Sequence, residues 1–144
     1  MSTVVRHVKH LQGARTASGV AVVIDVFRAF TTAAFCVAAG AREIVLVKDP
    51  EEALAMKERD RDLFLTGEVG GRPIDGFDVG NSPSHIVGLD LSGRRVVQRT
   101  SGGTQGVVAA AAVAREVVLG SLVIASATHR YVCCARSTAS TWSS

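Results

Sequence analysis

The sequence has few cysteines, and their arrangement does not suit a disulfide framework. Three cysteines occur in 144 residues, and two of them, Cys133 and Cys134, are adjacent, whereas Cys36 lies far away. The chain begins Met-Ser-Thr-Val-Val-Arg-His and has no basic segment followed by a long apolar run, so no secretory signal peptide is expected. These absences favour a reducing compartment, and we expect a cytoplasmic protein.

Long uninterrupted apolar segments and blocks of charge are also absent. The apolar stretch 107–125 is broken by Arg115 and Glu116, which argues against a membrane span. The 16 Lys and Arg against 13 Asp and Glu give a net charge of +3, and the basic residues are scattered. We therefore expect neither a nucleic-acid partner nor a membrane, and a small anionic ligand fits better.

Several standard site motifs are missing as well. Cys133 and Cys134 with His129 could be metal ligands, but there is no CxxC pair, and incidental thiols are the more ordinary interpretation. No Gly-Lys-Ser/Thr sequence marks a P-loop, and no three glycines have the dinucleotide spacing. The histidines have no Ser and Asp partners at a triad spacing, which argues against a serine hydrolase.

Short apolar runs alternate with helix-like segments along the chain. Strands are predicted at 20–26, 43–47, 63–66, 95–98 and 116–119, with helices at 29–39 and 105–114 and another from Pro50. Gly40 is placed to end the first helix, and Asp49 to cap the second. The strand predicted at 20–26 is a nearly continuous apolar run and is expected to be buried. This alternation predicts an α/β protein, a three-layer α/β/α sandwich with a parallel or mixed sheet.

An acid and a base lie at the end of the first predicted strand and just beyond it. Because ligands of open α/β sheets bind beyond the carboxyl ends of the strands, Asp25 could bind magnesium or attack phosphorus, and Arg28 could hold two phosphate or sulfonate oxygens. Alternatively, Asp25 caps the following helix and Arg28 forms a surface salt bridge. Their position alone leaves both alternatives open. Phe27 stands where phosphatases with an Asp-x-Asp pair have their second acid, so that mechanism is not supported.

Two glycine-rich segments follow later strands. Residues 99–106 read Arg-Thr-Ser-Gly-Gly-Thr-Gln-Gly and open a helix, an arrangement that turns N–H groups towards an anion, with a plain capped turn as the alternative. The long segment 67–80 carries Glu68, Asp75 and Asp78, which are oxygen ligands suited to magnesium, although acids on loops are usually just solvated. Ser82 is placed to cap a short helix beginning at Pro83.

Taken together, these segments resemble the 2-phosphosulfolactate phosphatase family. The likeness is carried by residues 23–32, 67–71, 74–83, 99–104 and 119–122, of which the string Gly-Phe-Asp-Val-Gly-Asn-Ser-Pro at 76–83 is the most specific. The resemblance implies magnesium-dependent hydrolysis of the phosphate ester of 2-phospho-3-sulfolactate to 3-sulfolactate and phosphate, a step of coenzyme M biosynthesis.

The resemblance also implies roles for individual residues. Asp25, Glu68 and Asp78 would hold Mg²⁺ or activate water and, with Arg28, form the catalytic set. The residues expected to bind the small anionic phosphate ester are Arg28, Asn81, Ser82, Thr100, Ser101, Gly103 and Thr104. Family members commonly have Asn-Gly-Thr in the third motif, where this chain has Gly102, Gly103 and Thr104.

The resemblance fades after Ala127, and family members are substantially longer. We therefore expect an α/β domain over residues 1–131 that is truncated relative to the family and incomplete at its C-terminus. An irregular tail rich in hydroxyl residues is expected over 132–144. A non-catalytic remnant or anion-binding module is the alternative to a phosphatase, and a homodimer could cover exposed apolar surface.

Overall fold

Strands and helices alternate through a computed structural model that describes the backbone of residues 4–138 and the side chains of residues 4–134. The elements, in chain order, are α1 (His10–Ala14), β1 (Val20–Ile24), α2 (Ala29–Ala38), β2 (Glu43–Leu46), α3 (Pro50–Arg59), β3 (Phe64–Gly67), β4 (Val79–Gly80), η1 (Pro83–His85), β5 (Arg95–Arg99), α4 (Gly103–Ala111), β6 (Glu116–Gly120), η2 (Leu122–Ile124) and α5 (Ala125–Thr138).

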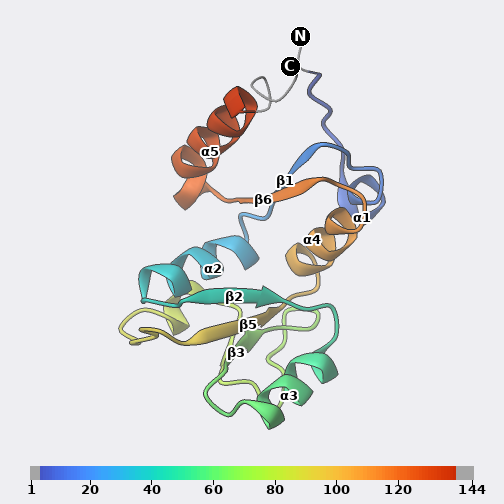
Figure 1. Cartoon of the computed structure of the whole chain (residues 1–144). Coiled ribbons are helices and arrows are strands. Elements are labelled where there is room, and N and C mark those ends of the chain that lie inside the picture. Colours follow the sequence, from blue (N-terminus) through green and yellow to red (C-terminus); the bar gives the residue numbers. More distant parts are fainter. Residues whose placement is uncertain (1–3, 139–144) are drawn as a thin grey trace.

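The larger sheet has four parallel strands in the order β2-β5-β3-β4. Phe64 and Val96 pack in one core cluster with Cys36 of α2, whereas their neighbours Leu65 and Val97 belong to a second cluster that includes residues of α3. Successive residues of a strand point to opposite faces, so both faces of this sheet are buried. Helix α2 covers one face and α3 the other (Figure 1). The predicted α/β class with parallel strands is confirmed.

The remaining strands, β1 and β6, form a separate parallel pair with Val20 opposite Glu116 and Ile24 opposite Gly120. Helices α4 and α1 lie on one side of this pair and α5 on the other (Figure 1). Helix α4 connects the two sheets, because it begins after β5 and is followed by β6. The strands are thus divided between two sheets.

The first strand differs from the sequence-based expectation. It ends at Ile24 and not at residue 26, and its side chains Val22 and Ile24 are 40% and 68% exposed. Among the described residues no strand pairs with the outer edge of β1, and α5 contacts β6. The prediction of a buried strand is therefore wrong for this face of β1.

The helix ends follow local chemistry closely. After α2, the Gly40 N–H donates to Val37 O and the Ala41 N–H to Cys36 O, with Gly40 at φ +96°, which is the glycine termination predicted there. Asp49 occupies the N-cap of α3 as expected, but its side chain makes no capping hydrogen bond. Helix α4 begins at Gly103, two residues earlier than predicted from Gln105.

The C-terminal part of the chain is more regular than expected. Helix α5 includes residues up to Thr138, so positions 132–138 of the predicted irregular tail are helical, and residues 139–144 lie outside the described part. The segment 121–138 contains neither glycine nor proline, the residues that most often interrupt a helix. Among the helices of residues 4–138, none has the length and apolar character needed to cross a membrane.

Candidate active site

Asp25 directly follows β1 and faces the start of two helices. Its N–H donates to Gly120 O at 3.0 Å, which extends the pairing of β1 with β6. Its Oδ1 accepts a hydrogen bond from the Ala29 N–H at 3.3 Å, so the predicted capping role exists, although Arg28 occupies the N-cap of α2. Among the described residues, Oδ2 accepts no hydrogen bond. The carboxylate therefore has one oxygen engaged by α2 and one available.

The available oxygen lies against the first residue of α4. A Cβ built on Gly103 would be 2.8 Å from Asp25 Oδ2, 2.6 Å from Ala29 Cβ and 3.2 Å from the Phe30 ring. A Cβ on Gly102 would be 3.6 Å from Asp25 Oδ2, an ordinary contact. Only glycine at position 103 lets α4 begin this close to the carboxylate, so two of the predicted site segments do converge.

The two threonines of the third motif hold residues 100–104 together. Thr100 Oγ1 accepts the Thr104 N–H at 3.1 Å, Thr104 Oγ1 accepts the Thr100 N–H at 2.8 Å, and the Thr104 hydroxyl also donates to Thr100 O. Both side chains are buried, with 1% and 0% of their surface exposed. These hydroxyls make their hydrogen bonds within the loop, and their binding of substrate stays a prediction.

The hydrogen-bond donors still available to a ligand here are backbone N–H groups at the start of α4. Within the described part of the chain, the N–H groups of Gly102, Gly103 and Gln105 make no hydrogen bond. Unpaired N–H groups at a helix N-terminus, together with the helix dipole, attract anions. Arg28 is exposed and forms no ion pair with any described residue. The N–H groups therefore give Asp25 a hydrogen-bond-donating neighbour, and Arg28, three residues along the chain, has a side chain available for an anion.

Glu68 directly follows β3, and its carboxylate forms hydrogen bonds with the loop that precedes α4. Its Oε1 accepts the Ser101 N–H at 2.6 Å, and its Oε2 accepts the Gly71 N–H at 2.6 Å and the Ser101 hydroxyl at 3.2 Å. Burial raises the pKa of Glu68, but these hydrogen bonds and the charge of Arg99 outweigh it and hold the pKa below its ordinary value. Glu68 is thus a charged carboxylate, and its hydrogen bonds orient Ser101.

Arg99, at the end of β5, is a contributor that the sequence analysis did not assign to the site. Its Nη1 donates to Glu68 O at 2.8 Å, and its Nε donates to Lys48 O at 3.0 Å. Gln105 Nε2 also donates to Lys48 O, at 2.7 Å. The available signal was an arginine at the last position of the strand Arg-Val-Val-Gln-Arg, where its side chain can reach the loops that follow neighbouring strands.

The residues predicted from the second motif divide between two places. Asn81 is buried, and its Oδ1 accepts a hydrogen bond from Gln98 Nε2, which also donates to Ala29 O at 2.8 Å. Asn81 therefore supports the start of α2 from inside the protein. The Ser82 hydroxyl is bonded to that of Ser84 and does not cap η1, so that predicted cap is wrong.

Asp78 directly precedes β4 and already has partners. Its carboxylate receives hydrogen bonds from Lys57 Nζ, at 2.6 Å to Oδ1, and from the Leu65 N–H at 2.7 Å. Since Leu65 is in the middle of β3, Asp78 sits before the end of the sheet that carries Glu68. Asp75, in the same segment, is exposed.

The three carboxylates predicted to hold magnesium do not converge. Among the residues with described side chains, no three His, Cys, Asp or Glu residues are grouped so that they could hold a metal ion. Asp78 is paired with Lys57, and both Glu68 oxygens accept N–H donors. Asp25 keeps an available oxygen beside the unpaired N–H groups at the start of α4. A single carboxylate of this kind fits the common magnesium site of one or two carboxylates completed by substrate phosphate.

Comparison with known proteins identifies relatives over most of the chain. Residues 6–140 match the family model described as 2-phosphosulpholactate phosphatase. A probable 2-phosphosulfolactate phosphatase of Deinococcus radiodurans is 49% identical over 112 residues, covering 78% of this chain and 47% of the relative. Its counterpart from Thermus thermophilus is 44% identical over 111 residues, covering 77% and 46%. The matched part of the chain thus spans about half the length of these relatives.

Replacing Gly103 with alanine tests the close contact at Asp25. We expect Gly103→Ala to lower the free energy of unfolding by about 1 to 3 kcal/mol, because the overpacked methyl group outweighs the better helix propensity of alanine. The matched control is Gly102→Asn, where the new Cβ has room and asparagine is a favoured N-cap. Urea denaturation of both variants measures the difference, and equal stability of the two would contradict the contact.

The lowered pKa of Glu68 predicts a specific dependence of stability on pH. A carboxyl group whose pKa is lower in the folded than in the unfolded protein stabilises the folded state. This contribution is complete at pH values above the ordinary pKa of glutamate, about 4.3, and it is lost as the pH falls through the lower folded-state pKa. We expect Glu68→Gln to be less stable than the parent chain at pH 7, because one amide –NH₂ would face an N–H donor. The difference should shrink below about pH 4. Urea denaturation between pH 7 and pH 3 tests this, and a constant difference would contradict it.

Proposed function

This chain belongs to the 2-phosphosulpholactate phosphatase family, and on that premise we propose that it acts on 2-phospho-3-sulfolactate or a related small phosphorylated acid. The reaction is hydrolysis of the phosphate monoester to 3-sulfolactate and phosphate. Water supplies the oxygen of the new P–O bond, and the bond from phosphorus to the ester oxygen breaks. The oxygen that leaves takes up a proton.

The observation that supports this proposal is the packing of Asp25 against the glycine start of α4. It puts a carboxylate oxygen next to N–H groups that have no partner among the described residues. A phosphate group needs such donors for its oxygens, and phosphoryl transfer relies on positioning and charge stabilisation more than on other protein chemistry.

We assign the roles from this arrangement. The N–H groups of Gly102 and Gly103 would bind phosphoryl oxygens, and Arg28 would hold a second anionic group, the sulfonate or carboxylate of the substrate. Asp25 Oδ2 would act at phosphorus, either by direct attack or by taking a proton from the attacking water. Glu68, Arg99, Thr100 and Thr104 would keep the loop in its binding conformation.

Magnesium binding is the alternative role in this proposal for Asp25 Oδ2, which would then hold the ion as its protein ligand and would not itself act at phosphorus. When bound, the ion neutralises charge on the phosphoryl oxygens. The proposal leaves Glu68 and Asp78 out of the ligand set, because their oxygens already accept hydrogen bonds from N–H donors. Phosphate release from 2-phospho-3-sulfolactate, measured with magnesium and with a chelator, tests both substrate and metal. Absence of turnover with retained phosphate binding would favour an anion-binding module instead.

The role of Asp25 is separable from its capping hydrogen bond. Asp25→Asn keeps an oxygen that can accept the Ala29 N–H but removes the charge. We expect phosphate release to fall by at least about 100-fold while the free energy of unfolding changes by less than about 1 kcal/mol. Steady-state assays and urea denaturation together measure this. Unchanged turnover with lowered stability would mean that Asp25 is only a helix cap.

The role of Arg28 predicts a change in substrate binding. Arg28→Lys keeps the charge but loses the planar pair of donors that matches an anion, so we expect KM to rise about 10-fold or more. The control is Arg42→Lys, because Arg42 is an exposed arginine before β2, at the opposite end of the strands. Equal KM values for the parent and both variants would refute the assignment.

A further inference from the structure

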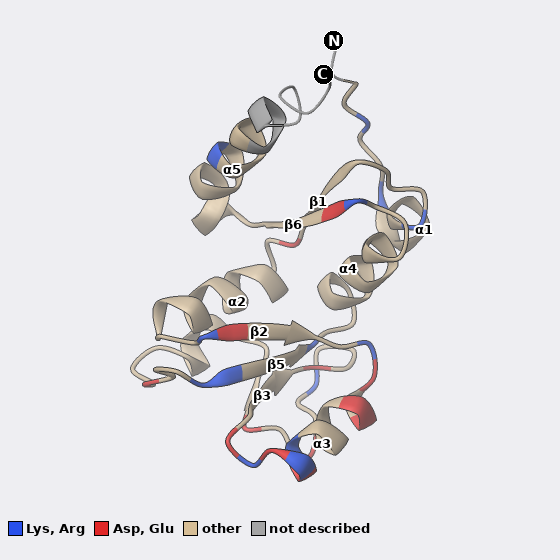
Figure 2. Ribbon diagram, viewed as in Figure 1, with Lys and Arg blue, Asp and Glu red and all other residues tan. Residues whose placement is uncertain are grey.

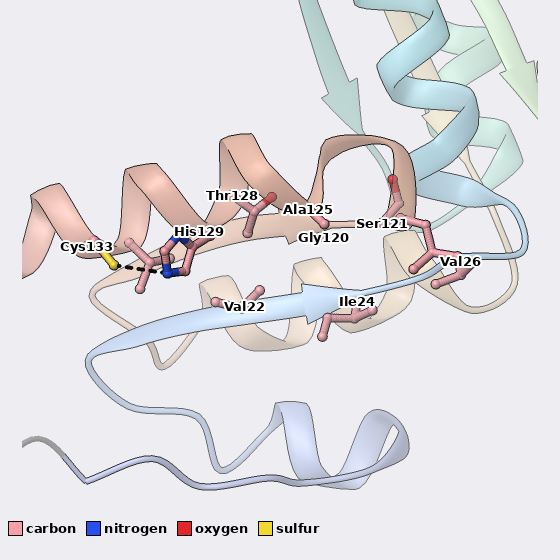
Figure 3. A pocket seen from close by; sticks show the side chains of 11 residues that line it. Val22, Ile24, Val26, Gly120, Ser121, Ala125, Thr128, His129 and Cys133 are labelled. Carbon is pink, nitrogen blue, oxygen red and sulfur yellow. Dashed lines mark hydrogen bonds between the residues drawn. The ribbon is translucent and has the colours of Figure 1, made fainter.

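Helix α5 carries a histidine and a cysteine one turn apart. His129 and Cys133 are separated by four positions, so they lie on the same face of the helix, and His129 Nε2 is 3.6 Å from Cys133 Sγ (Figure 3). Both residues are exposed. Because α5 extends into the segment predicted to be irregular, it brings together two of the three residues considered above as metal ligands.

The separation of these two atoms matches one edge of a tetrahedral zinc site. Zinc binds cysteine sulfur at about 2.3 Å and histidine nitrogen at about 2.0 Å, with ligands arranged as a tetrahedron. A sulfur and a nitrogen in such a site are therefore about 3.5 Å apart. Helical zinc motifs also use two ligands four residues apart on one face. The pair can thus hold an ion with almost no change in the distance between its atoms.

Neighbouring side chains fix this face of α5 against β6. The Thr128 hydroxyl donates to Leu119 O at 2.9 Å, and the Tyr131 hydroxyl forms a hydrogen bond with the Glu116 carboxylate. Leu119 and Glu116 both belong to β6. The backbone that carries the histidine and the cysteine is therefore positioned before any ion arrives, which lowers the entropic cost of binding.

The groove between β1 and α5, which the pair lines, offers no charge that would repel a cation. Its volume is about 450 Å³, and none of the described residues that line it is charged. Arg130 follows His129 in α5 but does not line the groove. Charged side chains gather around α3 and the larger sheet (Figure 2). An imidazole and a thiolate without carboxylates suit zinc and similar ions better than magnesium.

We propose that His129 and Cys133 form a binding site for a divalent cation of the zinc type. On binding, the Cys133 thiol gives its proton to solvent, and Sγ and the lone pair of His129 Nε2 bond to the ion in place of their mutual hydrogen bond. Among the residues with described side chains no third His, Cys, Asp or Glu joins the pair, so water takes the remaining positions of the tetrahedron. This inference does not depend on the phosphatase chemistry.

The test is a titration of the reduced, untagged chain with Co²⁺, which takes the place of zinc and absorbs in the near ultraviolet when a thiolate binds it. We expect a saturable thiolate-to-cobalt band. Zn²⁺ should remove this band, because zinc binds such ligands more tightly than cobalt, whereas Mg²⁺ should not. Absence of a saturable band, or its removal by Mg²⁺, would overturn the proposal.

Variants locate the site. We expect Cys133→Ser to abolish the band and His129→Gln to weaken Co²⁺ binding at least about 10-fold, because losing even an outer-shell partner of a ligand costs that much. Cys134→Ser is the matched control, since Cys134 is also exposed on α5 but is turned about 140° from His129 around the helix. Circular dichroism verifies that each variant is folded. Equal loss in both cysteine variants, or unchanged binding in His129→Gln, would mean adventitious binding to thiols and would overturn the proposal.

Discussion

The contact between Asp25 and the first residue of α4 is the constraint on which the candidate site depends. Helix α4 leaves the larger sheet after β5 and returns the chain to the smaller sheet at β6, and Asp25 follows β1 of that smaller sheet. Where α4 meets Asp25 and Ala29, the absence of a side chain at Gly103 sets how closely the start of α4 approaches the end of β1 and the start of α2. The surroundings of the carboxylate and the position of α4, which connects the two sheets, therefore depend on the same contact.

The loop before α4 is held in place by side-chain hydrogen bonds. Thr100 and Thr104 form hydrogen bonds with each other inside the protein. The Glu68 carboxylate accepts hydrogen bonds from both the N–H and the hydroxyl of Ser101. Because these side chains bond within the loop, the backbone N–H groups at the helix start are left unpaired among the described residues, in a loop that several hydrogen bonds hold. Donors that are fixed before the ligand arrives stabilise developing charge without reorganisation, which is the property an anion site requires.

Local patterns predicted the parts of the structure that local chemistry determines. The alternation of apolar runs and helices indicated the α/β class, Gly40 marked the end of α2, and the glycine-rich motif marked the start of α4. Such local patterns could not predict contacts between residues far apart in the sequence. The partner of Asp78 is Lys57, 21 residues away, and only the folded chain brings them together. Similarly, the continuous apolar sequence of β1 could not reveal that Val22 and Ile24 are uncovered.

The central claim is that an anion binds where Asp25 meets the start of α4. The most direct measurement is a titration of the ¹⁵N-labelled chain with inorganic phosphate, followed by the amide chemical shifts in NMR spectra. The account predicts that saturable shifts are largest at Gly102, Gly103 and Gln105, with smaller ones at residues preceding α2. Saturable shifts confined to other elements, or no shifts at all, would contradict it.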